Sequence, residues 1–281
     1  MNSAFLPIFE TMLSVNPEKI NLDSLDFPSE KLERTVCIDF YFPKDSTNPS
    51  FDVMLINDGQ DLRTMKFGNI LQDLYKADAI RPLLCIGIHA GLQRKLEYGT
   101  ANTADFKGRG NRARLYMQFI IEELIPAIHK LFPEKTMSSW AFAGFSLGGL
   151  SALDITWTHH KLFKMAAVFS GSLWWRTLGM EDPDYQDELH RIMHNQIRDG
   201  EFVPGLKFFF ECGTEDETED RNGNGIIDSI DDTLDLINQL VSKGYDPKTD
   251  IYYHEIRGGK HDLATWALAF PVFLQWAFPK D

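Results

Sequence analysis

The chain has 281 residues, of which 43% are hydrophobic and 25% charged, and its formal net charge is −13. This balance is ordinary for a soluble globular protein, and the length suffices to bury a large core without disulfides or structural metals. The acidic charge repels phosphate backbones and anionic membrane surfaces. We therefore expect neither nucleic acid nor a membrane as a partner.

The cysteine content and the first residues bear on the compartment. Cys37, Cys85 and Cys212 lie in apolar, strand-like runs, which favours buried thiols in a reducing compartment over a disulfide framework. Residues 1–19 lack the basic start and uninterrupted apolar stretch of a signal peptide, and no run approaches 18 apolar residues. The sequence therefore predicts a cytoplasmic protein.

Strand-like and helix-like patterns alternate along the chain. Short apolar runs predict strands at 34–42, 51–57, 83–89, 139–143, 165–169, 206–212 and 251–256. Helical spacing predicts helices at 67–74, 111–132 with a kink at Pro126, 147–157, 185–198, 230–243 and 262–277. Such alternation predicts a mostly parallel sheet with helices on both faces.

No linker or repeat divides this pattern. We expect one domain over residues 1–281, with 1–30 as an N-terminal extension and 213–232 as an acidic insertion.

A nucleophile motif follows the strand at 139–143. Gly144-Phe145-Ser146-Leu147-Gly148 reads G-x-S-x-G between a predicted strand and a predicted helix. This context is typical of the strained turn that exposes a catalytic serine in α/β-hydrolases, where small flanking residues let strand and helix approach. The sequence predicts Ser146 as a nucleophile, with the N–H of Leu147 at the helix start as an oxyanion donor.

A catalytic base and an acid are expected later in the chain. His261 follows the last predicted strand in a glycine-rich stretch, whereas most other histidines fall on helices; His89, at a strand end, is interpreted as a packing residue or an indirect neighbour of the substrate. Asp216 comes three residues after Gly213, which we expect to end a strand. Spacing alone leaves the neighbouring Glu215 and Glu217 as alternatives to Asp216.

A second oxyanion donor is expected at another strand end. The strand at 51–57 runs into Asp58-Gly59-Gln60, where the glycine lets the backbone turn toward the site. The N–H of Gln60 is therefore the predicted second donor.

Five segments together resemble the esterase family that includes enterochelin esterases, feruloyl esterase domains, S-formylglutathione hydrolases and the antigen 85 mycolyltransferases. The segments are LINDGQD at 55–61, RKLEY at 94–98, GFSLGG at 144–149, FFECGTEDE at 209–217 and GGKHDLATW at 258–266. The resemblance runs from about Arg34 to Phe278 and implies an α/β-hydrolase fold. It also implies that Ser146, His261 and Asp216 form a catalytic triad, that Gln60 supplies an oxyanion N–H, and that Arg94 lies beside the substrate.

Residues 220–231 match the calcium-binding loop of EF-hands. Oxygen-bearing side chains recur at loop positions 1, 3, 5, 9 and 12, glycine stands at position 6, and position 7 would offer a carbonyl. The predicted ligands of a structural Ca²⁺ are Asp220, Asn222, Asn224, Ile226, Asp228 and Asp231. A solvated acidic turn is the alternative, and aspartate at position 12 departs from the usual glutamate.

The sequence thus predicts a serine esterase that acts on a small-molecule ester without a catalytic cofactor. Trp174 and Trp175 follow a strand at the active end of the sheet, where they would either line a pocket or pack beneath a loop. Acyl transfer to a sugar or thiol acceptor is one alternative function, and a non-catalytic binding protein with the same fold is another. The sequence does not specify the oligomeric state.

Overall fold

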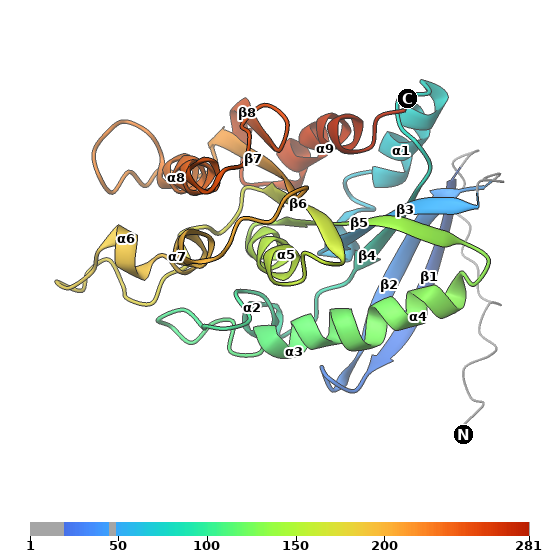
Figure 1. Cartoon of the computed structure of the whole chain (residues 1–281), viewed down its shortest axis with the longest axis horizontal. Helices are drawn as coiled ribbons and strands as arrows, with labels where there is room; N and C mark the ends of the chain where they lie inside the picture. Colours follow the sequence, from blue (N-terminus) through green and yellow to red (C-terminus); the bar gives the residue numbers. More distant parts are fainter. Residues whose placement is uncertain (1–19, 45–48, 281) are drawn as a thin grey trace.

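A computed structural model describes residues 20–44 and 49–280, so the segment tested above for a signal peptide lies outside the described residues. One eight-stranded sheet runs through the molecule (Figure 1). Its strands are β1 (Ile20–Ser29), β2 (Arg34–Pro43), β3 (Ser50–Asn57), β4 (Leu83–Ile88), β5 (Thr136–Phe145), β6 (Phe163–Phe169), β7 (Lys207–Glu215) and β8 (Ile251–Lys260).

The sheet confirms the expected mostly parallel arrangement. Its strand order is β1-β2-β4-β3-β5-β6-β7-β8. β2 is antiparallel to both β1 and β4, and every pair from β4 to β8 is parallel. The carboxyl ends of β3 to β8 therefore meet at one edge, where the predicted catalytic residues were expected.

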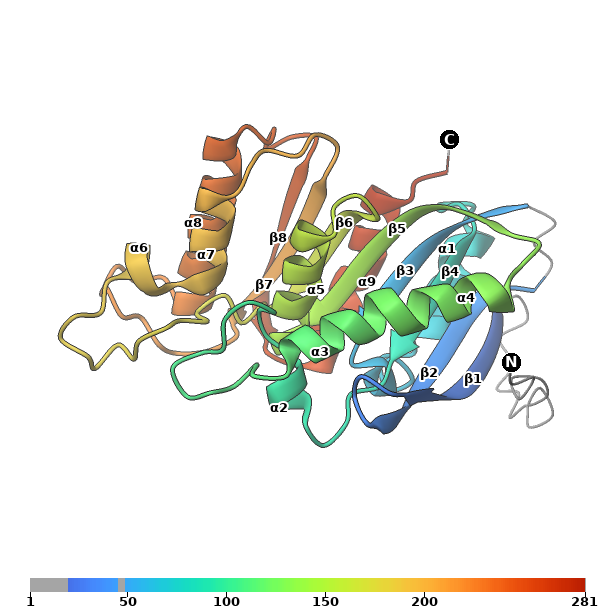
Figure 2. The same cartoon turned by 60° about the horizontal axis from the view of Figure 1, so that its bottom comes forward.

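Helices cover both faces of the sheet (Figures 1 and 2). α1 (Phe67–Lys76) and α9 (Leu263–Ala277) share one apolar layer with the sheet. The layer on the opposite face contains side chains from α3 (Ala113–Gln118), α4 (Ile125–Leu131), α5 (Leu147–Thr158), α7 (Ile192–Asp199) and α8 (Asp228–Lys243). Two short helices, α2 (Arg94–Glu97) and α6 (Asp187–His190), lie in connecting segments.

Burial explains the composition of the central elements. Every residue of β4 is buried, as expected for a parallel strand covered on two faces. Helix α5 is apolar around most of its circumference, because it is buried from Leu147 to Trp157. The edge strand β1 alternates partly buried and exposed residues, and it carries Asp23, Asp26 and Pro28, which discourage pairing with another sheet.

Several boundaries differ from the sequence expectations. Residues 20–29, within the expected N-terminal extension, form strand β1. The single helix expected at 111–132 contains a π-helical segment, η2 (Phe119–Leu124), immediately before α4. Pro126 explains this widening, because proline lacks an N–H and its ring clashes with the carbonyl four residues earlier.

The ends of β7 and β8 also differ from the sequence expectation. Gly213 does not end its strand, because β7 continues to Glu215 and pairs there with Lys260 after a register shift. A Cβ on Gly213 would lie 2.4 Å from the carbonyl carbon of Gly259. The two glycines thus let the strand backbones approach closely at the irregularity, and His261 follows β8 directly rather than a glycine-rich loop.

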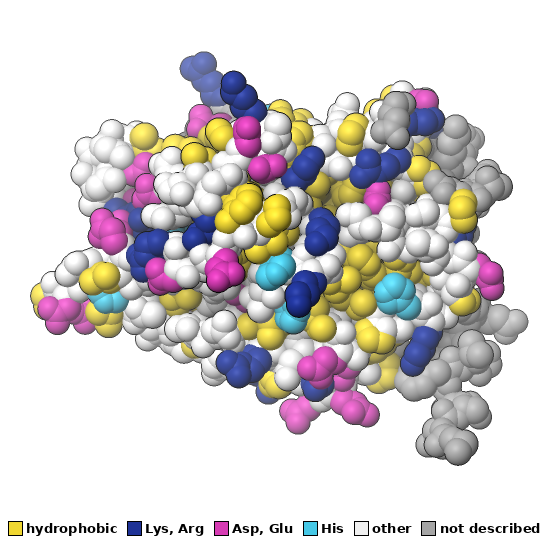
Figure 3. Space-filling model, viewed as in Figure 1, with side chains coloured by type: hydrophobic (Ala, Val, Ile, Leu, Met, Phe, Trp, Pro, Cys, Tyr) yellow, Lys and Arg dark blue, Asp and Glu magenta, His cyan; other side chains and the backbone are white. Residues whose placement is uncertain are grey.

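The molecular surface carries charges of both signs. Acidic and basic side chains are interspersed with apolar patches across the face shown in Figure 3.

All three cysteines are free; Cys85 and Cys212 are buried as expected, whereas Cys37 is only partly buried. None of the helices in the described ranges is long and apolar enough to cross a membrane.

Candidate active site

Ser146 occupies a strained turn between β5 and α5. Its φ and ψ are 53° and −122°, a conformation that is costly for a residue with a side chain. A Cβ on Gly144 would lie 2.3 Å from the carbonyl oxygen of Gly148, so this close approach requires glycine at position 144. The local geometry is therefore the strand–turn–helix arrangement that the motif predicts.

The two predicted oxyanion donors lie at the ends of neighbouring strands. Within the described ranges, neither the N–H of Leu147 nor that of Gln60 meets a backbone acceptor. The turn after β3 is held against the start of α5, because the Asn57 amide donates to the Gly148 carbonyl at 2.7 Å. The backbone N–H groups of Leu147 and Gln60 are therefore both available at the same edge of the sheet.

Aromatic packing connects His261 to the serine turn. The His261 ring meets Trp266 edge-on at 5.2 Å, and Trp266 stacks on Phe145 at 5.0 Å. Desolvation is the main reason that the pKa of His261 is lowered, and the positive charge of Arg94 adds to this effect. The negative charge of Asp216 opposes it by favouring the protonated ring. His261, Asp216 and Arg94 are thus electrostatically coupled.

The predicted acid lies near His261 without bonding to it. Both carboxylate oxygens of Asp216 are buried and have no hydrogen-bond partner in the described structure. Burial raises the pKa of Asp216, while the nearby Ser170 hydroxyl, the Gly213 backbone and His261 oppose this rise. No hydrogen bond joins Ser146 to His261 or His261 to Asp216 among the described residues. Such contacts are often long before substrate binds.

Sequence reasoning missed a buried network behind the predicted acid. The indole N–H of Trp266 donates to Ser170 Oγ at 2.9 Å, and that hydroxyl donates to Glu211 Oε2 at 3.4 Å. Glu211 is 1% exposed, and burial, with help from the charge of Asp216, raises its pKa to about 8. Glu211 therefore carries a proton at neutral pH. No sequence pattern marked it, because it stands in an apolar strand.

Two further polar groups adjoin the serine turn. Ser172 is 4% exposed, and its Oγ lies 3.4 Å from Ser146 Oγ. The Arg94 guanidinium pairs with Asp58 through two bonds, of 2.6 and 2.7 Å. The predicted substrate arginine is thus held beside the turn that carries Gln60.

The two predicted pocket tryptophans differ. Trp175 is fully buried and packs against Gly99 and Gly110, in the segment between α2 and α3. Trp174 is partly buried, and the Arg109 guanidinium lies 4.7 Å from its ring centroid. Only Trp174 keeps accessible surface for the predicted role.

A hollow of about 410 Å³ lies next to the position of His261. It is lined by Thr64, Met65, Lys66, Asp262, Leu263, Ala264 and Ala267. Its lining therefore comes from the residues that directly follow His261 and from the segment that follows Gln60.

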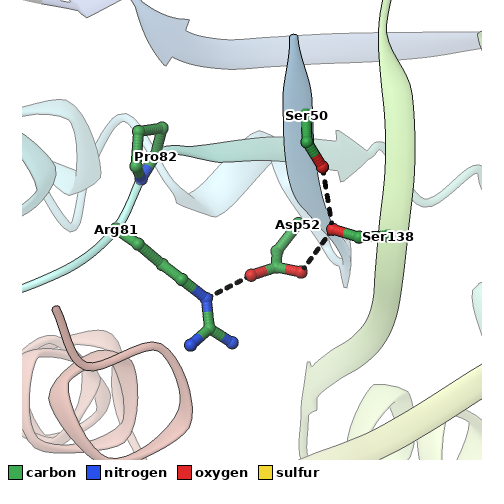
Figure 4. Close-up of a pocket in the computed structure, with 5 residues that line it drawn as sticks. All are labelled: Ser50, Asp52, Arg81, Pro82 and Ser138. Carbon is green, nitrogen blue, oxygen red and sulfur yellow. Dashed lines mark hydrogen bonds and ion pairs between the residues drawn. The ribbon is translucent and has the colours of Figure 1, made fainter. Parts of the chain in front are cut away.

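A second hollow, of about 290 Å³, lies away from these residues (Figure 4). Arg81 pairs with Asp52, whose other carboxylate oxygen accepts from Ser138 at 3.1 Å. These groups stand at or near the amino ends of β3, β4 and β5. The hollow is thus at the sheet edge opposite the predicted nucleophile.

The predicted calcium loop is curled by hydrogen bonds. Asp220 accepts from the backbone N–H groups of residues 223, 224 and 225, and the amides of Asn222 and Asn224 both donate to Asp231. Asn222, Asn224 and Asp231 are thus joined through their side chains, whereas Asp220 contacts the loop backbone. Asp228 instead accepts from Arg221 and lies in an ion pair with it. The calcium ion stays a prediction, with three of its predicted side-chain ligands in mutual contact through Asp231.

A family profile described as "Putative esterase" matches residues 29–277. The chain belongs to this family. Among curated proteins, the siderophore triacetylfusarinine C esterase of Aspergillus fumigatus is 33% identical over 85 residues, which cover 30% of this chain and 29% of that protein.

Solved structures of several esterases share the fold of this chain. The enterobactin esterase FES from Shigella flexneri has a TM-score of 0.72 at 20% identity, over 92% of this chain and 59% of the Shigella chain. The siderophore hydrolase EstB from Aspergillus nidulans has a TM-score of 0.67 at 16% identity, over 97% and 100% of the two chains. These similarities establish the α/β-hydrolase fold.

Proposed function

We propose that this protein hydrolyses carboxylic esters through an acyl-enzyme on Ser146. Ser146 Oγ attacks the ester carbonyl while His261 takes its proton, and the N–H groups of Leu147 and Gln60 stabilise the oxyanion. His261 then gives the proton to the leaving alcohol. Water, deprotonated by His261, then attacks the acyl group, and His261 returns the proton to Ser146 Oγ as the acid product leaves. Asp216 stabilises the imidazolium in both half-reactions.

The strained backbone at Ser146 carries this proposal. A φ of 53° on a non-glycine residue persists only where the surrounding structure over-determines it. The residues around Ser146 impose it through a glycine contact before the serine and a helix that starts directly after it. Family membership supports the same reaction class.

The substrate class rests on the named relatives. The curated relative and two of the structural relatives are described as esterases or hydrolases of siderophores. We therefore place siderophore esters first among the substrates, with feruloyl esters as the next class, since a ferulic acid esterase shares the fold.

Turnover of p-nitrophenyl acetate by the full chain tests the reaction class. Ser146→Ala should lower kcat by about 1,000-fold or more, whereas Ser138→Ala, at the opposite sheet edge, should leave it unchanged. A fluorophosphonate should label the wild type and Ser138→Ala but not Ser146→Ala. Absence of both turnover and labelling in the wild type would favour the non-catalytic binding protein.

A panel of esters then tests the substrate class. It should contain enterobactin, triacetylfusarinine C, methyl ferulate and acetylated sugars, compared by kcat/KM. A preference for acetylated sugars over both siderophores would overturn the proposed substrate class but not the proposed reaction.

A further inference from the structure

Three side chains of the types that ligate metals converge where β2 pairs with the end of β4. They are Cys37 and Asp39 of β2, and His89, which directly follows β4. Their donor atoms, one from each side chain, all lie within 4.8 Å of one another. In the described part of the chain, this is the one such cluster of cysteine, histidine and acidic side chains.

Strand register explains the convergence. The His89 N–H donates to the Cys37 carbonyl at 3.0 Å, so these two residues face each other across the antiparallel pair of β2 and β4. Asp39 lies opposite Gly87, which has no side chain. The carboxylate can therefore lean across the strand, and its Oδ2 lies 3.1 Å from His89 Nε2.

We propose that Cys37, Asp39 and His89 form a binding site for a zinc ion. Thiolate, imidazole and carboxylate are the ligand types that zinc takes from proteins, and bonds of about 2.0–2.3 Å hold tetrahedral ligand atoms roughly 3.5 Å apart. The observed spacing reaches this arrangement by small side-chain rotations. The fourth position goes to water or a ligand.

The outer contacts of Asp39 suit a metal ligand. Oδ1 accepts from Ser24 at 2.5 Å and from Arg63 at 3.2 Å, which leaves Oδ2 for the ion. Hydrogen bonds of this kind orient ligating carboxylates in metal sites. The Arg63 side chain is 52% exposed, so solvent screens the repulsion between its charge and the ion.

The charges balance when the ion binds. Cys37 loses its thiol proton to solvent as the sulfur–metal bond forms, and thiolate and carboxylate together neutralise the divalent ion. The Asp39 side chain is 0% exposed, whereas His89 is 23% exposed and Cys37 is partly buried. An ion can therefore enter from the His89 side. The site is independent of the proposed ester hydrolysis, because none of its three ligands takes part in that reaction.

Cobalt substitution tests the site on the full chain after treatment with a chelator. One equivalent of Co²⁺ should produce a thiolate-to-cobalt absorption band in the near ultraviolet, and one equivalent of Zn²⁺ should remove it. Cys37→Ser should abolish the band. Ser24→Ala, which removes an outer hydrogen bond, should weaken zinc binding by about 10- to 100-fold.

Cys85→Ala is the matched control, since Cys85 lies on β4 but outside the cluster. It should keep the band, and excess Ca²⁺ should not displace Co²⁺. Melting curves of the metal-free variants show whether each is folded. Absence of the band in the wild type, or its persistence in folded Cys37→Ser, would overturn the proposal.

Discussion

The guanidinium of Arg94 donates two hydrogen bonds, of 2.6 and 2.7 Å, to the carboxylate of Asp58. The Asp58 side chain is 3% exposed, and its backbone takes the left-handed conformation with a φ of 59°. Asp58 forms the turn that leads to the free N–H of Gln60. The ion pair therefore fixes the backbone that would present the second oxyanion donor.

Arg94→Gln should damage both stability and catalysis. Asp58 would stay buried without its cation, so the free energy of unfolding should fall by about 1–3 kcal/mol. The freed turn should misplace the Gln60 N–H and lower kcat by about 10- to 100-fold. Arg34→Gln is the control, because Arg34 makes an equivalent two-bond pair with buried Glu97. Equal losses of kcat in both variants would refute a specific role for Arg94.

The pH profile should report the lowered pKa of His261. In the proposed mechanism the neutral imidazole is the base, and desolvation favours that form. The acid limb of kcat/KM should therefore have its midpoint below the ordinary histidine pKa of about 6.5, with a plateau at neutral pH. A stopped assay from pH 4.5 to 8 measures this profile. A midpoint above 7 would contradict the assignment of His261.

Asp216→Asn should move that limb to still lower pH. The negative charge of Asp216 raises the pKa of His261, so its removal leaves the ring easier to deprotonate. At the same time kcat should fall by about 100-fold or more, because the imidazolium loses its counter-charge. Glu217→Gln removes a nearby carboxylate as the control. An unchanged midpoint in Asp216→Asn would show that another group orients His261.

Glu211 should make stability depend on pH. Its pKa is about 8 in the folded protein, against an ordinary value of about 4.5, so the folded chain holds a proton that the unfolded chain releases. Its contribution to the free energy of unfolding is complete below about pH 4.5 and declines, by a few kcal/mol, as the pH rises through about 8. Urea unfolding at pH 5, 6.5 and 8 should show this decline in the wild type and in exposed Glu215→Gln, but much less in Glu211→Gln.

Calcium should stabilise the loop at 220–231 if the predicted site binds the ion. At a free concentration 100 times Kd, binding to the folded state adds about 2.7 kcal/mol to the free energy of unfolding. Asp231→Asn removes the carboxylate that both asparagine amides contact, and it should abolish the gain in melting temperature. Asp235→Asn, later on α8, is the control. No calcium effect on wild-type melting would exclude the site.

Local features were the ones that sequence reasoning predicted well. The turn at Ser146 depends on glycines within two residues of it, and the choice of strand or helix depends on short periodicities. Neighbouring residues therefore determine both features. Element ends were less predictable. Gly213 and Gly259 mark a close approach of two strands rather than the end of one, and the sequence contains no sign of that approach.

The sequence by itself determined the fold class and the chain order of the predicted serine, acid and base. Only the tertiary structure decided that Trp175 is buried, that Arg94 holds Asp58, and that Glu211 lies behind the predicted acid. It also placed Cys37 opposite His89 across the pair of β2 and β4. The reason is physical: most of these relationships join residues tens of positions apart, and strand register with burial sets the partners and protonation of each side chain.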